Sequence, residues 1–303
     1  MVIDESDTES GTVVPTRGGA QRASRVGTRR TELFVTEKGE GPRVLLLHGQ
    51  PGVGKDFAKV AALLEADHRV ISPDRPGYGS SSAPAVSMEE NANLMAELLE
   101  ERSAVPATVV GHSYGGGVAI LLAARRPDLV AGLVLVGSLG RGDSVNAFDR
   151  LLAAPVVGEA LSAACLFTFG RVLPLLRRAA STAPRDLVVR LRASLPDSQF
   201  VDQDLRRGHE VLRSFVFEQR ALISEIAEVE ASLKLVDAPT IVVTGEWDVV
   251  VPPSVARSIA AAVRGAELVT VERAGHFVPR DAPSVVARTV RSVEDRARQI
   301  GAE

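Results

Sequence analysis

The sequence has little of several features that would each mark a class of protein. Cysteine occurs once, at Cys165, which excludes an intramolecular disulfide framework and indicates a reducing compartment. Neither sign of charge prevails, because 35 basic residues face 38 acidic ones and leave a net charge of −3. The chain therefore lacks the excess of positive charge that is typical of nucleic-acid-binding proteins, and its charge gives no reason to expect binding to anionic membranes. We therefore expect a cytoplasmic protein with no nucleic-acid partner.

Long apolar runs are also missing. The longest apolar window, residues 156–176, is interrupted by Glu159, Arg171 and Pro174, so it is a poor membrane span and more typical of a buried or pocket-lining segment. The N-terminal region has no apolar stretch of the kind found in a signal peptide. Its polar and charged composition predicts a disordered tail over residues 1–21. Lysine is scarce, with 4 Lys against 31 Arg, a bias typical of GC-rich bacterial genomes.

The rest of the chain alternates between strand and helix patterns. At 45% hydrophobic residues it can bury a substantial core. An alternating stretch at 30–41 predicts an outer antiparallel strand, and a helical pattern opens with Ser87 as its N-cap. A continuous apolar run at 43–49 predicts a strand covered on both faces, and further strands are predicted at 68–74, 107–113, 133–138, 239–248 and 266–276, with helical patterns between them. This order predicts an α/β fold, a mostly parallel sheet covered by helices on both faces.

The alternation stops over residues 139–235, where the pattern is helical throughout. We therefore expect one α/β domain in two parts, 22–138 and 236–303, with a helical segment inserted after a central strand.

The strongest chemical signal is the G-x-S-x-G motif formed by Gly111-His112-Ser113-Tyr114-Gly115, between a buried strand and a helix. A sharp turn of this kind projects Ser113 in a strained backbone conformation, and the two glycines leave room for tight packing. The N-terminus of the following helix directs its dipole and free N–H groups at the same place. This pattern predicts a nucleophilic serine.

A serine hydroxyl needs a base to become a nucleophile. Of the five histidines, His48 and His112 lie inside turn motifs, while His68 and His209 have no partner pattern. His276 follows the last strand at the edge where the Ser113 turn is expected, so we predict His276 as the base.

The base in turn needs an orienting carboxylate. Asp248 lies just past the preceding strand and is favoured by the order serine, acid, histidine. Glu246, two residues earlier, and Asp143, after an earlier strand, stay as alternatives.

A competing interpretation concerns the segment from Gly49 to Lys55, which fits the G-x-x-x-x-G-K part of a nucleotide-binding loop. The next residue is Asp56, however, and not the Ser or Thr whose hydroxyl would coordinate magnesium. A nucleotide-binding protein would also leave Ser113, Asp248 and His276 without a role. We keep it as a remote alternative.

Taken together, the motifs resemble those of the α/β-hydrolase superfamily, in its cap-bearing serine hydrolase branch, from about residue 22 to 298. The matching segments, in the order of the family, are His48–Gly52, Asp74–Ser81, Gly111–Gly116, Gly245–Pro252 and Gly275–Pro279. The resemblance implies the triad Ser113, Asp248 and His276, with no cofactor and no metal. It implies an oxyanion hole made by the backbone N–H groups of Gln50 and Tyr114, and a structural role for the loop Asp74–Ser81.

The resemblance also implies that segment 139–235 is a cap over the catalytic edge, with a small-molecule substrate bound between cap and core. Candidate substrate-binding residues are Tyr114, Phe277, Phe167 and Phe217. Relatives that cleave haloalkanes or epoxides need an aspartate as nucleophile, so Ser113 favours acyl transfer. We expect a monomeric or homodimeric enzyme that hydrolyses a small to medium, largely apolar ester, thioester or lactone. The alternative is that the same triad serves C–C bond hydrolysis or another cofactor-free lyase or oxygenase reaction.

Overall fold

The computed structural model describes residues 12–14, 21–28, 31–168 and 208–300. Most of the tail predicted over residues 1–21 and the middle of the predicted insertion, residues 169–207, lie outside the described residues. Within the tail, Thr12–Val14 forms strand β1.

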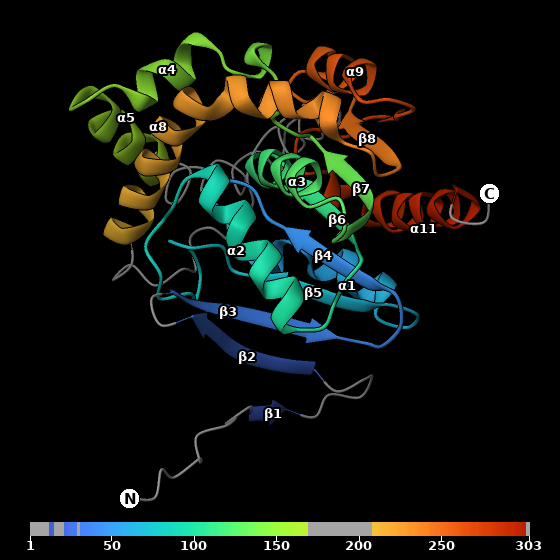
Figure 1. Cartoon of the computed structure of the whole chain (residues 1–303). Coiled ribbons are helices and arrows are strands. Elements are labelled where there is room, and N and C mark those ends of the chain that lie inside the picture. Colours follow the sequence, from blue (N-terminus) through green and yellow to red (C-terminus); the bar gives the residue numbers. More distant parts are fainter. Residues whose placement is uncertain (1–11, 15–20, 29–30, 169–207, 301–303) are drawn as a thin grey trace, which may run out of the picture.

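A single sheet organises the molecule (Figure 1). Its described strands are β1 (Thr12–Val14), β2 (Gln21–Thr28), β3 (Thr31–Lys38), β4 (Arg43–Leu47), β5 (Arg69–Pro73), β6 (Ala107–His112), β7 (Val130–Val136), β8 (Thr240–Gly245) and β9 (Glu267–Val271), in the spatial order β1-β2-β3-β5-β4-β6-β7-β8-β9. From β5 to β9 neighbouring strands are parallel, whereas β1, β2 and β3 are antiparallel to their neighbours. The predicted α/β fold with a mostly parallel sheet is confirmed.

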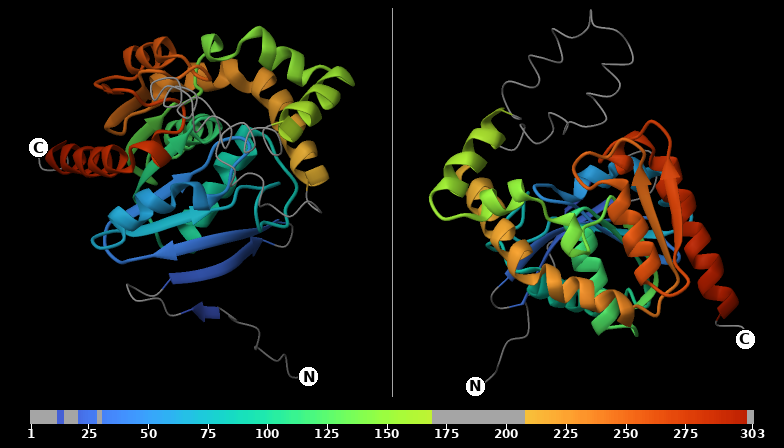
Figure 2. Two further views of the ribbon diagram at one scale, coloured as in Figure 1. Left: turned by 180° about the vertical axis from the view of Figure 1, so that it is seen from behind. Right: turned by 90° about the horizontal axis from the view of Figure 1, so that it is seen from above.

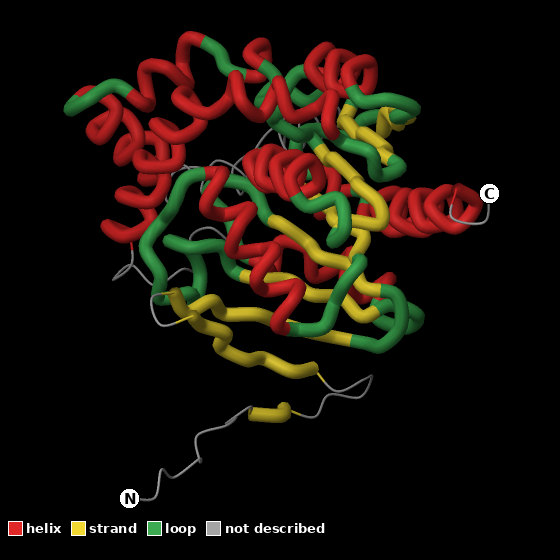
Figure 3. The backbone as a smooth tube through the Cα atoms, viewed as in Figure 1, coloured by secondary structure: helices red, strands yellow, loops and turns green. Residues whose placement is uncertain are grey.

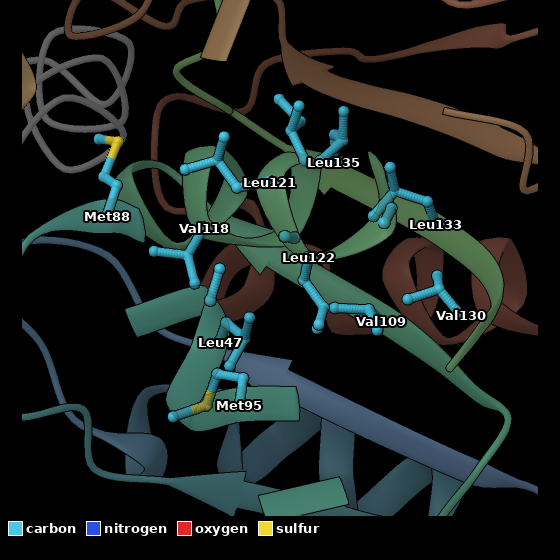
Figure 4. Close-up of a cluster of buried hydrophobic side chains, with 14 of the residues drawn as sticks. Leu47, Met88, Met95, Val109, Val118, Leu121, Leu122, Val130, Leu133 and Leu135 are labelled. Atoms are coloured by element: carbon cyan, nitrogen blue, oxygen red, sulfur yellow. The ribbon is translucent and has the colours of Figure 1, made fainter. Parts of the chain in front are cut away.

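The parallel strands β4 to β8 are apolar because side chains on both of their faces are buried, whereas the edge strand β9 is largely exposed or half-buried. In β4, Leu45 and Leu47 belong to one hydrophobic cluster, while Val44 and Leu46 belong to the other. Successive residues of a strand point to opposite faces, so a continuous apolar run supplies both clusters. Figure 4 shows part of the first cluster, including Leu47, Val109, Leu133 and Leu135 from the sheet.

Helices cover both faces of the sheet (Figure 3). Residues of α2 (Met88–Glu101), α3 (Tyr114–Arg125) and α9 (Pro253–Ala262) pack in the first cluster, and those of α1 (Ala58–Leu64), α10 (Val278–Asp281) and α11 (Pro283–Ile300) in the second. Short 3₁₀ turns lie at η1 (Gly54–Phe57), η2 (Gly142–Ser144) and η7 (Leu233–Leu235). Ser87 caps α2 as expected, because its hydroxyl accepts the N–H of Glu90 at 3.1 Å.

The described part of the insertion consists of α4 (Ala147–Ala153), α5 (Val157–Phe167) and α8 (Gly208–Ser232). Helix α8 packs against α4 and α5 and also against α2 and α3 of the core. The view from above in Figure 2 shows α8, in orange, extending across the molecule from α5. The insertion leaves the sheet at the carboxyl end of β7, and α8 leads back through η7 to the start of β8.

The edge of the sheet differs from the sequence-based expectation. The strand predicted at 30–41 forms as β3, but it is not the outer strand, since β2 and β1 add to it. The sequence of β2, Gln21–Thr28, contains only two hydrophobic residues and carries no clear period. An antiparallel edge strand is held mainly by backbone hydrogen bonds, which any sequence can form, so this pattern gave no signal.

Candidate active site

The serine of the G-x-S-x-G motif lies in the one-residue turn between β6 and α3. Ser113 has φ 54° and ψ −119°, a backbone conformation that residues other than glycine rarely adopt. The turn is held on both sides: the N–H of Ser113 donates to the carbonyl of Val136 at 3.0 Å, and its carbonyl accepts the N–H of Leu139 at 3.2 Å. The surrounding structure therefore enforces a conformation that costs about 1–3 kcal/mol.

Two glycines allow this turn to lie close to the end of β4. A Cβ on Gly115 would lie 2.4 Å from the carbonyl oxygen of Leu47 and 2.5 Å from that of His48. A Cβ on Gly111 would lie 2.5 Å from the carbonyl oxygen of Gly115. All of these distances are shorter than a real side chain permits. Gly115 therefore lets the start of α3 approach the end of β4, and Gly111 lets β6 pack against the start of α3.

The loop after β4 carries the second group of backbone donors. A Cβ on Gly49 would lie 3.0 Å from the Cβ of Ser113, so this loop passes directly beside the serine. In the described part of the chain, neither the N–H of Gln50 nor that of Tyr114 has a hydrogen-bond acceptor. Two unpaired donors on either side of a serine are suited to binding an oxyanion.

The buried pair Asp248 and His276 lies at the same edge. The Nδ1 of His276 is 2.9 Å from the Oδ2 of Asp248, and both side chains are buried. The other carboxylate oxygen, Oδ1, accepts the N–H groups of Val250 at 3.0 Å and Val251 at 2.8 Å. The backbone thus fixes the carboxylate, and its remaining oxygen holds the proton of the imidazole on Nδ1. That leaves Nε2 as a hydrogen-bond acceptor.

His112 joins the serine turn to the loop that carries His276. Its Nε2 donates to the carbonyl of His276 at 2.9 Å, and the two imidazole rings lie 4.8 Å apart between centroids. Burial, followed by the charge of His276, lowers the pKa of His112 to about 3. A neutral His112 donates this bond through Nε2–H. It therefore links the Ser113 turn to the loop of His276, and we do not assign it the role of the base.

The other carboxylates considered in the sequence do not reach His276. Asp143 is exposed and lies 3.5 Å from Arg141, and Glu246 is exposed and accepts the N–H of Arg273 at 2.9 Å. Of the three carboxylates, Asp248 is the one in contact with the imidazole.

The structure also tests the resemblance of Gly49–Lys55 to a nucleotide-binding loop. The N–H of Val53 donates to the carboxylate of Asp56 at 2.9 Å, and the N–H of Gly54 donates to the carboxylate of Asp74 at 2.8 Å. A phosphate-binding loop leaves such N–H groups free for the ligand. Here two carboxylates of the chain itself occupy them, which argues against bound phosphate.

The four aromatic residues proposed to bind substrate occupy different environments. The ring of Phe277 lies 5.4 Å from that of His276 and is partly buried. Tyr114 is fully buried, with its ring 4.8 Å below the Arg75 guanidinium, and its hydroxyl has no hydrogen-bond partner within the described ranges. Phe167 on α5 and Phe217 on α8 are 63% and 45% exposed, on the surface of the insertion.

Sequence reasoning missed Arg75 and Glu218, two fully buried charged residues beside the site. Arg75 lies in the segment Asp74–Ser81, which the sequence marked only as a structural loop. Glu218 lies in the middle of α8, where a charged residue in a helical pattern normally faces solvent. The two residues are separated by 143 positions in the sequence, and only the fold brings them into contact.

The described residues were compared with two further kinds of site, those for metal ions and those that span a membrane. They contain no group of three or more His, Cys, Asp or Glu side chains that could hold a metal ion. No single described helix is long and apolar enough to cross a membrane; α4 and α5 would suffice only if taken together, and they meet at 109°.

Buried histidines make stability depend on pH. Burial, and then the Arg75 charge, places the pKa of His48 well below its usual value, and the pKa of His112 is about 3. Between the folded pKa and the unfolded value near 6.5, the unfolded chain binds protons that the folded chain does not, so stability falls as pH falls. Through His112 alone, we expect the free energy of unfolding to be about 2 kcal/mol lower at pH 5 than at pH 7.

Denaturant unfolding at pH 7 and pH 5 measures this loss. His112→Gln keeps a donor toward the His276 carbonyl and should lose less stability on acidification than the wild type. His209→Gln, at the exposed start of α8, is the matched control and should keep the wild-type difference. An equal loss in His112→Gln and wild type would contradict the prediction.

Comparison with known proteins places the chain in a family. Residues 44–289 match the alpha/beta hydrolase family, and the chain belongs to this family of hydrolases. It is 26% identical to haloalkane dehalogenase 2 of Mycobacterium tuberculosis over 271 residues, which cover 86% of this chain and 91% of that protein. It is 37% identical to the pimeloyl-[acyl-carrier protein] methyl ester esterase of Chromobacterium violaceum over 166 residues, which cover 54% of this chain and 64% of that protein.

Solved structures agree with the fold. The crystal structure of the haloalkane dehalogenase DbeA from Bradyrhizobium elkani superposes with a TM-score of 0.69 at 22% identity, covering 92% of this chain and 98% of that chain. The α/β-hydrolase fold inferred from the ordered motifs is therefore confirmed.

Proposed function

We propose that the protein is a serine hydrolase that cleaves a small to medium carboxylic ester, thioester or lactone through an acyl-enzyme on Ser113. The observation that carries this proposal is the buried Asp248–His276 pair at 2.9 Å, which His112 links to the strained strand-to-helix turn of Ser113. The serine provides the nucleophile, the histidine the base, and the carboxylate holds the histidine in the required tautomer.

In the proposed mechanism, Nε2 of His276 takes the proton from Oγ of Ser113 as Oγ bonds to the substrate carbonyl carbon. The carbonyl π electrons move to oxygen, and the N–H groups of Gln50 and Tyr114 stabilise that oxyanion. The tetrahedral intermediate collapses, His276 protonates the leaving alcohol or thiol, and the acyl group stays on Ser113. Water, deprotonated by His276, repeats the sequence and releases the acid.

The similarity to haloalkane dehalogenases raises the main competing activity. Displacement of halide requires attack on a saturated carbon and an intermediate that water can hydrolyse. A carboxylate nucleophile forms an ester, which is hydrolysable, whereas Ser113 would form an unreactive ether. The serine therefore favours the acyl chemistry named for the esterase relative.

We also propose that the substrate lies between the core and the segment 139–235, which would act as a cap on the core formed by 22–138 and 236–303. The support is that α8 packs against both the insertion helices and the core helices α2 and α3. Phe277, beside His276, is the aromatic residue best placed to contact a bound acyl group. Tyr114, Phe167 and Phe217 remain candidates for the walls of the same site.

A serine-reactive probe and a substrate panel test this function together. We expect a fluorophosphonate to label the wild-type protein on Ser113, as mapped by peptide mass spectrometry. The panel contains nitrophenyl esters of increasing chain length, thioesters, lactones, haloalkanes and a vinylogous 1,5-diketone. Turnover of esters without halide release is expected. Halide release without ester hydrolysis would overturn the proposal, and turnover confined to the diketone would favour C–C bond hydrolysis.

A further inference from the structure

Arg75 binds the loop that carries the proposed oxyanion donor. This fully buried side chain donates from Nε to the carbonyl of His48 at 3.0 Å and from Nη2 to the carbonyl of Gly49 at 2.9 Å. Its own backbone N–H donates to Nε2 of His48 at 2.8 Å. One guanidinium thus fixes two successive carbonyls immediately before Gln50.

The Gly49 carbonyl matters because it shares a peptide unit with the N–H of Gln50. This peptide is trans, so its C=O and N–H point in opposite directions. Arg75 holds the carbonyl and thereby directs the Gln50 N–H to the opposite side of the loop. Gly49 lies against Ser113, with a built Cβ only 3.0 Å from the Cβ of the serine. The Nδ1–H of His48 donates to the same carbonyl at 2.9 Å, so the orientation of this N–H next to the serine depends on Arg75 together with His48.

Helix α8 of the insertion holds Arg75 in turn. The guanidinium forms an ion pair with the carboxylate of Glu218, which also accepts the hydroxyl of Tyr78 at 2.8 Å. Both charged side chains have no exposed surface. One turn earlier on α8, the Phe215 carbonyl accepts Nε2 of the Gln50 side chain at 2.9 Å. The loop is thus tied to α8 both through Arg75 and through Gln50 itself.

Stability alone does not account for such a pair. Taking two charges out of water costs several kcal/mol per ion, and well-packed apolar residues of similar volume are often at least as stable. Burial raises the pKa of Glu218, while the charge of Glu218 raises that of Arg75 despite burial. What the pair does provide is directed hydrogen bonds: one planar guanidinium can bind two carbonyls and a carboxylate at once, which apolar residues and lysine cannot do.

We propose that Arg75 is a positioning residue that orients the Gln50 N–H for the oxyanion hole, and that Glu218 makes this orientation depend on the seating of α8. The inference rests on the proposed function, because it needs an oxyanion at Ser113. The packing of α8 on the core and the orientation of the oxyanion donor then depend on the same buried ion pair.

Transition-state affinity tests this proposal better than activity alone. An alkyl trifluoromethyl ketone accepts Ser113 Oγ at its carbonyl carbon, the serine proton passes to His276, and the carbonyl oxygen becomes an anion in the hole. For Arg75→Met we expect the inhibition constant to rise and kcat to fall by about 10²-fold, with KM within about threefold, as for loss of an oxyanion donor. Glu218→Gln should show the same pattern with a smaller change of about tenfold.

Glu294→Gln is the matched control for Glu218→Gln. Glu294, on α11, is also a buried carboxylate. It accepts hydrogen bonds from Nε2 of His68 at 2.9 Å and from the hydroxyl of Thr108 at 3.2 Å, away from the loop that carries Gln50. We expect it to lower the melting temperature without changing kcat or the inhibition constant. If Arg75→Met does not fold, Arg75→Lys replaces it; the three donors of an ammonium lie on one nitrogen and do not reproduce the planar fork of the guanidinium, so the inhibition constant should still rise.

The outcomes separate the inference from the function on which it rests. If the wild type forms no adduct with the ketone, as followed by fluorine NMR, the proposed function fails and the inference fails with it. If the wild type forms the adduct and the Arg75 and Glu218 variants bind the ketone as tightly as Glu294→Gln does, the proposed function stands and the inference is overturned.

Discussion

Ser113→Ala is expected to lower kcat/KM on an activated aryl ester by about 10⁴- to 10⁶-fold, the range found when a catalytic serine is removed from a triad. The variant keeps the hydrogen bonds of the turn, because the N–H of Ser113 to Val136 and the carbonyl to Leu139 belong to the backbone. Its melting temperature should therefore stay within a few degrees of the wild type. Near-normal turnover by a preparation free of contaminating esterase would show that the nucleophile lies elsewhere.

Ser113→Gly provides a second, independent signature of the same turn. The backbone conformation at φ 54°, ψ −119° is strained for serine and alanine but accessible to glycine. The relief of strain, partly offset by the greater freedom of glycine in the unfolded chain, should make Ser113→Gly more stable than Ser113→Ala by about 1 kcal/mol. Both variants should be inactive. An inactive and more stable glycine variant would show that the strain is kept for function and not for folding.

Much of this site follows from local sequence. The turn at Ser113 and the buried strands around it are set by residues close together in the chain, so their patterns predict them directly. The contact between Asp248 and His276 joins residues 28 apart, and it is predictable because parallel strands end at one edge of the sheet. The order serine, acid, histidine favours Asp248 over Glu246 and Asp143, and the structure adds its contact with the imidazole of His276.

The link between core and insertion could not be predicted in this way. Arg75 and Glu218 are 143 residues apart, and each lies in a segment whose pattern has another explanation. Buried charge is not visible in a sequence, because the side chain is ordinary and only its surroundings are unusual. Similarly, β1 and β2 depend on edge pairing and not on an apolar pattern. The sequence thus predicts which residues are candidates for the site, but not the buried contacts between the core and the insertion.

The histidine and its carboxylate provide the second large effect. His276→Ala removes the base and should lower kcat/KM by about 10⁴-fold or more. Asp248→Asn is the more informative change. The backbone N–H groups of Val250 and Val251 donate to Oδ1 of Asp248, so an asparagine keeps these two bonds with its carbonyl oxygen and turns its NH₂ toward His276.

An NH₂ facing Nδ1 forces the imidazole into the opposite tautomer, with the proton on Nε2, where it cannot accept the proton of Ser113. We therefore expect Asp248→Asn to fold normally and to lose about 10⁴-fold in kcat. The matched control is Asp143→Asn, at an exposed carboxylate that lies 3.5 Å from Arg141, and it should keep wild-type kinetics. A mild effect of Asp248→Asn together with a large effect of Asp143→Asn would reverse the assignment. Slower labelling of Ser113 by the fluorophosphonate, at an unchanged melting temperature, would locate the defect in the activation of the serine by His276, because labelling uses the same base-assisted attack.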